Sequence, residues 1–323
     1  MFKKLTAVCV CLGLAVFIAG PGTGGTPSAQ AASPAGMTSV TVNGVKLTLE
    51  SQAYVKQGRV MAPLRDMAKG LGAQLYWDAA SRTATIKRDS HQAQIKAGSS
   101  RALRDGGVVI LDVPAEIRSG RVYVPLRFVV ESMGATISWN VKTGTAQIIL
   151  PLDPASAEKV IAERAAAAVQ ALKAKDWAAL SSMVHSSRGV RFSPYGYVDT
   201  SKDIVLSRGD IAAVGADGAV RTWGAYDGTG DPIKLTFAQY YDKFIYSADF
   251  AEAPEMGYNQ TIGTGNSLNN ARGVYPAAIL VEYHYDGFDP QYAGMDWQSL
   301  RLVFVKEGGQ WMLVGIIHDQ WTI

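Results

Sequence analysis

The chain has 323 residues, of which 48% are hydrophobic and 18% are charged. This balance is that of a globular protein long enough for two domains, and it excludes a chain that is disordered throughout. A formal net charge of +3 at pH 7 is far from the strongly basic balance of nucleic-acid-binding proteins, so we expect no nucleic-acid partner.

The first residues have the pattern of an export signal. Lys3 and Lys4 precede an apolar run over residues 5–19, and Ala29-Gln30-Ala31 forms a small-residue cleavage site. The apolar run is shorter than the roughly 18 apolar residues that indicate a membrane-spanning helix. We therefore predict a signal peptide over residues 1–31. The mature chain is expected to be secreted or cell-wall associated, without a transmembrane span.

Both cysteines, Cys9 and Cys11, lie inside this apolar run. Cleavage would remove every thiol from the chain. We therefore expect no disulfide, no thiolate metal site and no cysteine nucleophile in the mature protein.

A long internal repeat follows. The segment "GRVMAPLRDMAKGLGAQLYWD" (58–78) aligns with "GRVYVPLRFVVESMGATISWN" (120–140) at a constant offset of 62 residues. Each copy predicts a short strand, a helix that begins after the proline, a glycine that ends it, and a hairpin whose first strand carries a tryptophan. The two repeats predict a small antiparallel β-sheet domain with helices over residues 38–150.

The repeated arginines and tryptophans have two possible roles. We expect Arg65 and Arg127 to tie each helix start to a carboxylate or carbonyl of its own repeat, the alternative being a pair of anion-binding forks. Trp77 and Trp139 are expected in the core rather than as platforms for sugars. All four residues are therefore interpreted as structural parts of the repeat.

These elements resemble the copper amine oxidase N-terminal-like domain, or stalk domain, found on secreted proteins of Gram-positive bacteria. The resemblance rests on the GR-V-x-x-PLR, GA and W-D/N elements and covers roughly residues 38–150. It implies an accessory surface module.

The resemblance does not imply an oxidase. Copper amine oxidases need a tyrosine within a Thr-x-x-Asn-Tyr motif, which becomes a quinone, and three histidine ligands that include a His-x-His pair. The four histidines of this chain are His91, His185, His284 and His318, which are far apart in sequence. We therefore expect no bound metal, no cofactor and no copper amine oxidase activity.

A proline-bearing linker marks the start of a second domain, which we expect over residues 155–323. Asp153 suits the N-cap of a helix and Pro154 its first position. A shorter helix is expected from Trp177. Further along, Thr236 and Gln239 form a capping box at the start of a helix with a buried aromatic stripe.

Three strand candidates close the chain: "AAILVEYHYDGF", "SLRLVFVKEGG" and "QWMLVGIIHDQWTI". Helices followed by strands predict an α+β domain with a curved antiparallel sheet. This order and the last hairpin resemble the cone-shaped fold of nuclear transport factor two and the ketosteroid-isomerase-like proteins. That resemblance implies a cone-like domain but leaves its activity open, since such domains include isomerases, cyclases and non-catalytic binding modules.

Polar residues on the closing strands are the candidate binding residues: His284, Asp286, His318 and Gln320. Strand alternation places the first two on one face of their strand and the last two on one face of theirs. If both faces look inward, the two histidines meet across the sheet as a proton-transferring or ligand-orienting pair. The alternative is that these residues mark strand ends in solvent, or that each histidine is satisfied by a neighbouring carboxylate.

The favoured function is that of a secreted, non-catalytic protein whose cone-like domain binds an unidentified cell-envelope component or small molecule. Eleven of the 14 tyrosines lie in this half, which suits a lined pocket, an interaction surface or a large core. An enzyme acting inside the cone is one alternative. A structural, protein-docking module with a filled cone and aromatic residues on its outside is the other. The loop over residues 257–273 predicts a lid over the cone or a mobile surface loop.

Overall fold

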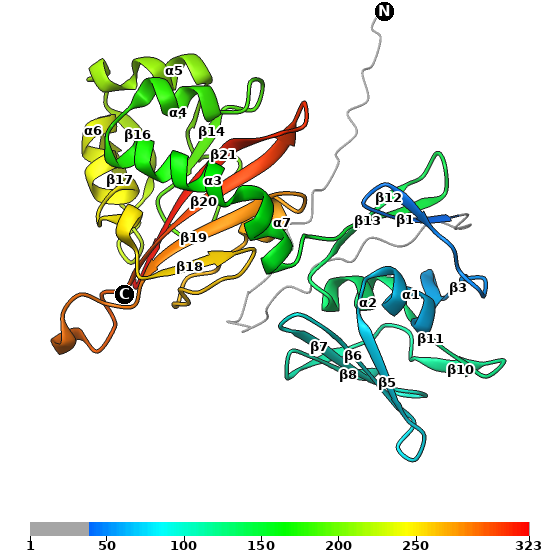
Figure 1. Cartoon of the computed structure of the whole chain (residues 1–323). Helices are drawn as coiled ribbons and strands as arrows, with labels where there is room; N and C mark the ends of the chain where they lie inside the picture. Colours follow the sequence, from blue (N-terminus) through cyan, green and yellow to red (C-terminus); the bar gives the residue numbers. More distant parts are fainter. Residues whose placement is uncertain (1–38, 323) are drawn as a thin grey trace, which may run out of the picture. The chain divides into compact units, whose positions relative to one another are not determined.

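The computed structural model describes residues 39–322, and the predicted signal peptide lies outside this range. The described chain is mixed α+β, and its two large hydrophobic clusters lie within residues 40–150 and residues 157–316. We call residues 39–150 the N-terminal segment and residues 154–322 the C-terminal segment (Figure 1).

The N-terminal segment contains two short helices and three small sheets. Its elements are β1 (Ser39–Val42), β2 (Val45–Leu47), β3 (Tyr54–Lys56), β4 (Arg59–Pro63), α1 (Leu64–Gly70), β5 (Gln74–Asp78), β6 (Thr83–Arg88), β7 (His91–Lys96), β8 (Arg101–Arg104), β9 (Gly107–Ile110), β10 (Glu116–Arg118), β11 (Arg121–Pro125), α2 (Leu126–Ser132), β12 (Thr136–Asn140) and β13 (Thr145–Ile149). The two sequence copies form the same series, β3-β4-α1-β5-β6 and β10-β11-α2-β12-β13.

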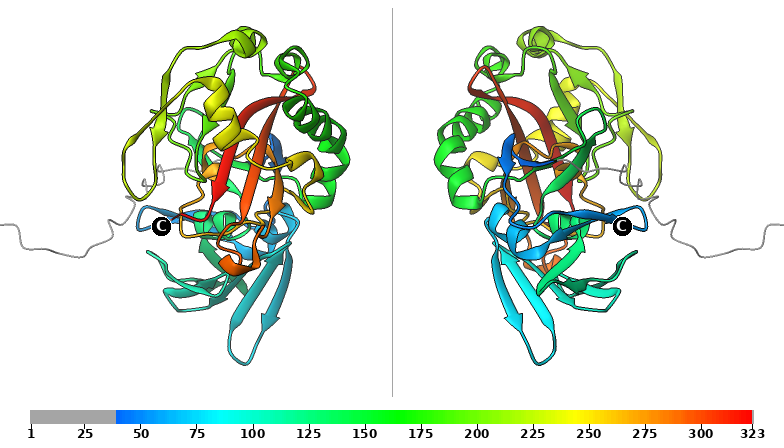
Figure 2. Two further views of the ribbon diagram at one scale, coloured as in Figure 1. Left: turned by 90° about the vertical axis from the view of Figure 1, so that its left-hand side faces the viewer. Right: turned by 90° about the vertical axis from the view of Figure 1, so that its right-hand side faces the viewer.

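One sheet joins the two copies through their equivalent strands. Its order is β10-β11-β4-β3, with β4 and β11 antiparallel at the centre. The hairpin β5–β6 continues into β7, β8 and β9 as a five-stranded antiparallel sheet, and Figure 2 shows this hairpin extending away from the helices. The sheets of this segment are antiparallel, as predicted, except that β1 pairs with β13 in parallel.

Helix ends in both copies follow the sequence signal. Gly72 and Gly134 have φ values of +66° and +70°, the left-handed conformation that ends a helix and that glycine adopts without steric cost. Each helix then returns directly into its hairpin. Buried residues of both helices, such as Met67 and Val129, share one core with the strands.

The C-terminal segment places helices before strands, as predicted. Its elements are α3 (Pro154–Lys173), α4 (Trp177–Met183), β14 (Val190–Ser193), β15 (Val205–Leu206), α5 (Arg208–Ala213), η1 (Val214–Ala216), β16 (Arg221–Ala225), β17 (Pro232–Leu235), α6 (Phe237–Tyr240), η2 (Tyr241–Ile245), η3 (Phe250–Glu252), β18 (Glu255–Tyr258), α7 (Ala271–Val274), β19 (Ile279–Tyr285), η4 (Pro290–Tyr292), β20 (Gln298–Glu307) and β21 (Gln310–Gln320).

Local sequence signals place the helix starts of this segment correctly. The Asp153 carboxylate accepts a hydrogen bond from the Ser156 amide at 2.9 Å, and Pro154 occupies the first turn of α3. Thr236 and Gln239 form the predicted capping box of α6. The helix continues as the π-helical turn η2, so its aromatic residues remain buried on one face.

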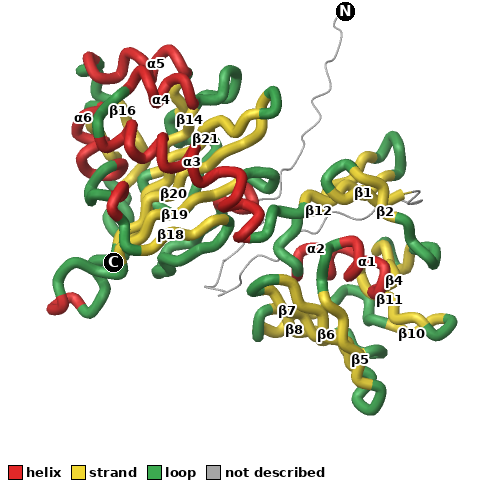
Figure 3. The backbone as a smooth tube through the Cα atoms, in the orientation of Figure 1, coloured by secondary structure: helices red, strands yellow, loops and turns green. Residues whose placement is uncertain are grey.

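A strongly curled six-stranded sheet dominates the C-terminal segment, in the order β15-β14-β21-β20-β19-β18. It is antiparallel except between β14 and β21, which are parallel. Helices α3, α4 and α6 with η2 cover one face, which we call the helix side (Figures 1 and 3). Residues 259–278 cover part of the opposite face, which we call the loop side, with α7 in a second, smaller core.

The β20–β21 pairing contains a β-bulge. Val303 lies opposite Gly315, but Phe304 lies opposite Leu313, so Val314 is the extra residue. Within residues 39–322, no helix is long and apolar enough to cross a membrane.

Candidate functional site in the C-terminal segment

Aromatic side chains occupy the helix side of the sheet. Trp223 and Tyr240 stack with ring centroids 4.1 Å apart, and Phe192 packs edge-on against both. Trp223 and Phe192 have no exposed surface. The space in which the cone analogy would enclose a ligand is therefore a packed aromatic core.

Strand register places the two candidate histidines on opposite faces of the sheet. His284 lies opposite Ser299, which lies opposite Asp319 on the next strand, and all three point to the loop side. His318 lies opposite Leu300, on the helix side. The two imidazoles therefore do not meet, so the condition on which a shared pair depended, that both faces look inward, is not fulfilled.

The other two candidates, Gln320 and Asp286, also lie apart from each other. Gln320 does lie beside His318, with Oε1 3.0 Å from the ring Nε2. His318 is fully buried against the edge of Phe244, and burial lowers its pKa. Asp286 is exposed just beyond the end of β19. The four residues thus form no common site.

A buried charge network lies on the loop side. The Arg301 guanidinium binds Asp319 Oδ2 at 2.6 Å and Glu282 Oε1 at 3.0 Å, and all three side chains are at most 5% exposed. The amides of Ile262 and Gly263 donate to Glu282 at 3.0 Å each. Burial disfavours the charged form of Glu282, but the Arg301 charge and these hydrogen bonds outweigh it and lower the pKa.

His284 belongs to this network. Its Nδ1 lies 2.8 Å from the hydroxyl oxygen of Ser299, and that hydroxyl lies 2.7 Å from Glu282 Oε1. Because a serine has one hydroxyl proton, donation to the carboxylate leaves its oxygen to accept from the imidazole. The predicted alternative was a neighbouring carboxylate, but the partner of His284 is the Ser299 hydroxyl, which in turn binds the Glu282 carboxylate. The loop over residues 257–273 covers this network rather than the helix side, so it is not a lid over the aromatic core.

An open cleft of about 740 Å³ lies outside the filled core, and two of its lining tyrosines, Tyr195 and Tyr226, pack against the helix-side cluster. Its walls are the loop that follows β14, the hairpin β16–β17 and residues 266–268. Three tyrosines line it, Tyr195, Tyr197 and Tyr226, and Tyr197 is 50% exposed. The other side chains that reach it include Asp199, Lys202, Asp203, Asp227 and Leu268.

Asp319 connects the cleft to the buried network. Its Oδ1 accepts a hydrogen bond from the Ser267 hydroxyl at 3.3 Å, on one wall. Gly196, in the other wall, lies so close that a Cβ there would be 2.7 Å from Asp319 Oδ2. The buried ion pair of Arg301 therefore supports both walls of the cleft.

Asp203 is the titratable group with the clearest perturbation in this cleft. Its carboxylate accepts from the Ser193 hydroxyl at 2.5 Å and from the Asp199 amide at 3.0 Å. Burial nevertheless raises its pKa to about 6, because these hydrogen bonds offset only part of the desolvation. The local charge of the cleft therefore changes within the mildly acidic range.

The cleft suits a cationic ligand. Three aspartates and one lysine give its lining a net charge of −2 when all are ionised. Tyrosine faces attract cations, and Lys243 already lies 4.4 Å from the centre of the Tyr226 ring. In residues 39–322 no group of three or more histidine, cysteine, aspartate or glutamate side chains is arranged to hold a metal ion.

The repeated residues of the N-terminal segment have unequal surroundings. Arg127 pairs with Glu131 of its own helix at 3.3 Å, as expected, and Trp139 packs against the core. Trp77 is 43% exposed, so its expected core position is wrong. Arg65 is exposed and makes no hydrogen bond or ion pair with the described residues, which corrects the expected tie to its own repeat.

Sequence reasoning missed Arg301, Asp319 and the cleft tyrosines. Arg301 stands in the otherwise apolar stretch "SLRLVFV", and that interruption was the available signal. The cleft had no such signal, because its walls come from three separate loops.

Comparison with known proteins supports the interpretation of the N-terminal segment. Residues 41–148 match the family model described as "Copper amine oxidase N-terminal domain". The match is to this N-terminal domain alone and not to the catalytic domain of that family, and it confirms the stalk-type resemblance. A curated protein from Brevibacillus choshinensis, named "Protease inhibitor", is 32% identical over 102 residues. The aligned part is 31% of this chain and 31% of that relative, so this chain matches about a third of the relative's length.

Proposed function

We propose that this protein is an exported, non-catalytic binding protein, in which a stalk-type module accompanies a cone-like ligand-binding domain. The partner would be a cell-envelope component or small molecule that carries a cationic group. The observation that supports this most is the open, acidic, tyrosine-lined cleft beside a sheet whose helix side is filled. The stalk-type family match agrees with a surface role.

Binding at the cleft is tested with short capped peptides. A lysine-containing peptide, acetyl-Gly-Lys-Gly-Lys-Gly amide, should bind the full chain in calorimetry, and the glutamate analogue should not. Asp227→Asn and Tyr197→Ala should each weaken binding about tenfold, whereas Asp242→Asn, an exposed acid outside the cleft, should not. Equal binding of the lysine and glutamate peptides would refute the assignment.

The pH dependence gives a second readout. Deprotonation of Asp203 adds a negative charge to the cleft, so binding of the lysine peptide should strengthen as pH rises through about 6. Asp203→Asn should remove that step. Turnover of a substrate that depends on Asp203 would instead favour the enzyme alternative, since a raised pKa in a cleft is also typical of acid–base catalysts.

Export is tested by the N-terminus of the mature protein. If residues 1–31 are removed by signal peptidase, sequencing of the extracellular form should begin near Ala32. Full-length protein retained in the cytosol would contradict this part of the proposal.

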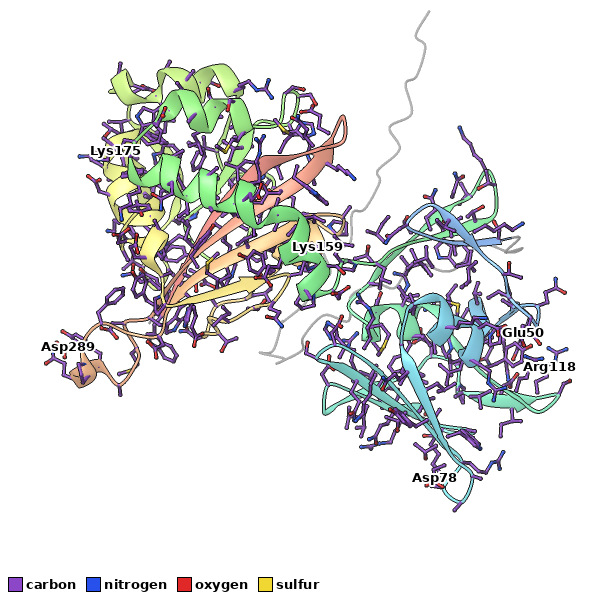
Figure 4. All side chains as sticks on the ribbon, in the orientation of Figure 1. Glu50, Asp78, Arg118, Lys159, Lys175 and Asp289 are labelled. Atoms are coloured by element: carbon purple, nitrogen blue, oxygen red, sulfur yellow. The ribbon has the colours of Figure 1, made fainter. Side chains whose placement is uncertain are left out.

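A protein-docking role is the second candidate. The filled helix side, which this alternative predicts, and one exposed loop favour it. Residues 286–297, between β19 and β20, present Phe288, Tyr292 and Met295 with about half of each side chain exposed. The Asp296 carboxylate fixes this loop by accepting from the amides of Phe288 and Asp289, and Figure 4 labels Asp289 on it. Exposed apolar side chains on an ordered loop suit insertion into a partner's pocket.

The similarity to a protein named "Protease inhibitor" gives this docking role a direct assay. The full chain should be tested against a panel of serine proteases, with Phe288→Ala/Tyr292→Ala as the variant. Inhibition lost in that variant would support docking by the loop. Inhibition that persists would assign it elsewhere in the chain.

A further inference from the structure

A second pocket lies in the N-terminal segment, between the first repeat and the strands β10 and β11 of the second repeat. It has a volume of about 270 Å³ and lies between the start of α1, the hairpin β5–β6 and the strands β10 and β11. We call it the repeat-one groove. Its apolar wall is formed by Leu64, Leu75, Ala84, Ile117 and Val122. In Figure 4, the labels of Asp78 and Arg118 mark the last residues of β5 and β10, two of the strands that border it.

The polar side chains of this groove have one property in common. They are Arg65, Arg121 and Trp77, and each of them is a hydrogen-bond donor only. A ligand that binds here must therefore supply acceptors. Polyhydroxylated sugars also need acceptors from the protein, so they match this lining less well than an anion does.

The two repeats differ at the helix position four residues after the repeated arginine, and this position determines whether that arginine has an ion-pair partner. In the second repeat, Glu131 pairs with Arg127 at 3.3 Å and approaches Arg104 at 3.8 Å. At the offset of 62, Lys69 takes the place of Glu131. A lysine four residues along the helix repels Arg65 instead of binding it. The Arg65 guanidinium is consequently left free at the rim of the groove.

The charge around the groove fits a monoanion. Arg121 pairs with Glu50 at 3.2 Å, but the two side chains are 38% and 61% exposed, and such surface pairs are weak. Arg65 and Arg121 together with Glu50 leave one net positive charge. The volume is near the lower end of the range for small-molecule sites, which suits one residue or one small molecule.

We propose that the repeat-one groove binds a carboxylate attached to an apolar group. Arg65 and Arg121 bind the carboxylate, and the apolar wall and the exposed face of Trp77 contact the apolar group. Two kinds of ligand carry such a carboxylate. One is a peptide with a free C-terminal residue, and the other is a small apolar acid. This site is independent of the cleft in the C-terminal segment.

The test titrates the full chain with matched probes and follows binding by calorimetry. Acetyl-Ala-Ala-Leu with a free C-terminus represents the peptide source, and hexanoate represents the free acid. The peptide amide removes the charge and should bind at least tenfold more weakly than the acid. A preference for the peptide over hexanoate assigns the first source, and the reverse preference assigns the second. Equal binding of acid and amide, or no binding of either carboxylate at millimolar concentration, overturns the proposal.

Two variants localise the site, each with a control. Arg65→Gln should weaken carboxylate binding about tenfold, whereas the same change at the matched position of the second repeat, Arg127→Gln, should leave it unchanged. Lys69→Glu gives the first repeat a carboxylate at the position equivalent to Glu131 of the second repeat, and Lys69 itself does not line the groove. The new carboxylate should pair with Arg65 and reduce affinity several-fold while leaving the circular dichroism spectrum unchanged. Equal effects of Arg65→Gln and Arg127→Gln, or full affinity in Lys69→Glu, would place binding elsewhere.

Discussion

Arg301 and Asp319 form an ion pair with Nη1 2.6 Å from Oδ2, and the two side chains are 2% and 5% exposed. The same guanidinium binds Glu282, and the second oxygen of Asp319 binds Ser267 at the rim of the cleft. Buried ion pairs contribute little net stability over an apolar replacement, but removing one partner alone is costly. This pair is therefore best understood as a fixed support for the loops that form the cleft.

Arg301→Met should destabilise the protein by about 3–5 kcal/mol, because Glu282 and Asp319 would then be buried without a cation. Urea denaturation followed by circular dichroism measures the change. The matched control is Lys202→Met, since Lys202 is 78% exposed and its pair with Asp199 spans 3.6 Å. Its cost should stay below about 1 kcal/mol. Similar losses in both variants would contradict a supporting role for Arg301.

Gly263→Ala tests how tightly the loop is packed on the network. A Cβ at this position would lie 2.5 Å from the Ser299 hydroxyl and 2.7 Å from the Trp297 ring. Overpacking of this kind costs about 1–3 kcal/mol. Gly218→Ala is the control, because nothing lies within 4 Å of the added Cβ. A Gly263→Ala variant with wild-type thermal stability would show that the loop yields easily.

His318 should make stability dependent on pH. Burial lowers its pKa in the folded protein below the ordinary value of 6.5, so the unfolded chain binds more protons in the interval between the two values. Its contribution is therefore fully present above 6.5 and decreases as pH falls below it. Asp203 has the opposite sign, since its raised pKa favours the folded state at low pH until it ionises near 6.

The two groups are separated by comparing variants. His318→Gln should show a flatter decline of unfolding free energy than the wild type between about pH 7 and about pH 5. If His318→Gln declines as steeply as the wild type, another group is responsible for the slope.

The two segments should fold independently, because each has its own helices, strands and buried core. Fragments consisting of residues 38–150 and 155–323 should each show cooperative unfolding. Limited proteolysis of the intact chain should cut first between residues 150 and 157. A single transition for the whole chain, with neither piece folded alone, would indicate one fused unit.

Local signals predicted much of this structure. The capping aspartate of α3, the capping box of α6 and the glycines after α1 and α2 each act within a few residues, and all occupy the predicted positions. Elements defined by short-range hydrogen bonds and backbone sterics can be read from neighbouring residues. The three closing strands followed for the same reason, since alternation and turn residues are local.

The candidate site required information that no single segment contains. Whether His284 and His318 meet depends on how β19 and β20 pair with β21, and a shift of one residue in either pairing reverses the answer. The repeated arginines also differ, since Arg127 has an ion-pair partner and Arg65 has none among the described residues, but here the reason is different. Lys69 and Glu131 were both visible in the alignment of the two copies, but only the observed ion pair of Arg127 gives that difference its meaning.

The bulge at Val314 has a consequence for changes in chain length. It lets Leu313 remain in the helix-side core while Asp319, six residues later, still reaches Arg301 on the other face. Deleting one residue here would exchange the two faces of β21 on one side of the deletion. Either Leu313 would then leave the helix-side core, or Asp319 would point away from Arg301. A substitution in this strand leaves the facing of its other residues unchanged, whereas a change in its length does not. Over evolution, insertions and deletions should therefore accumulate in the 286–297 loop and spare β21.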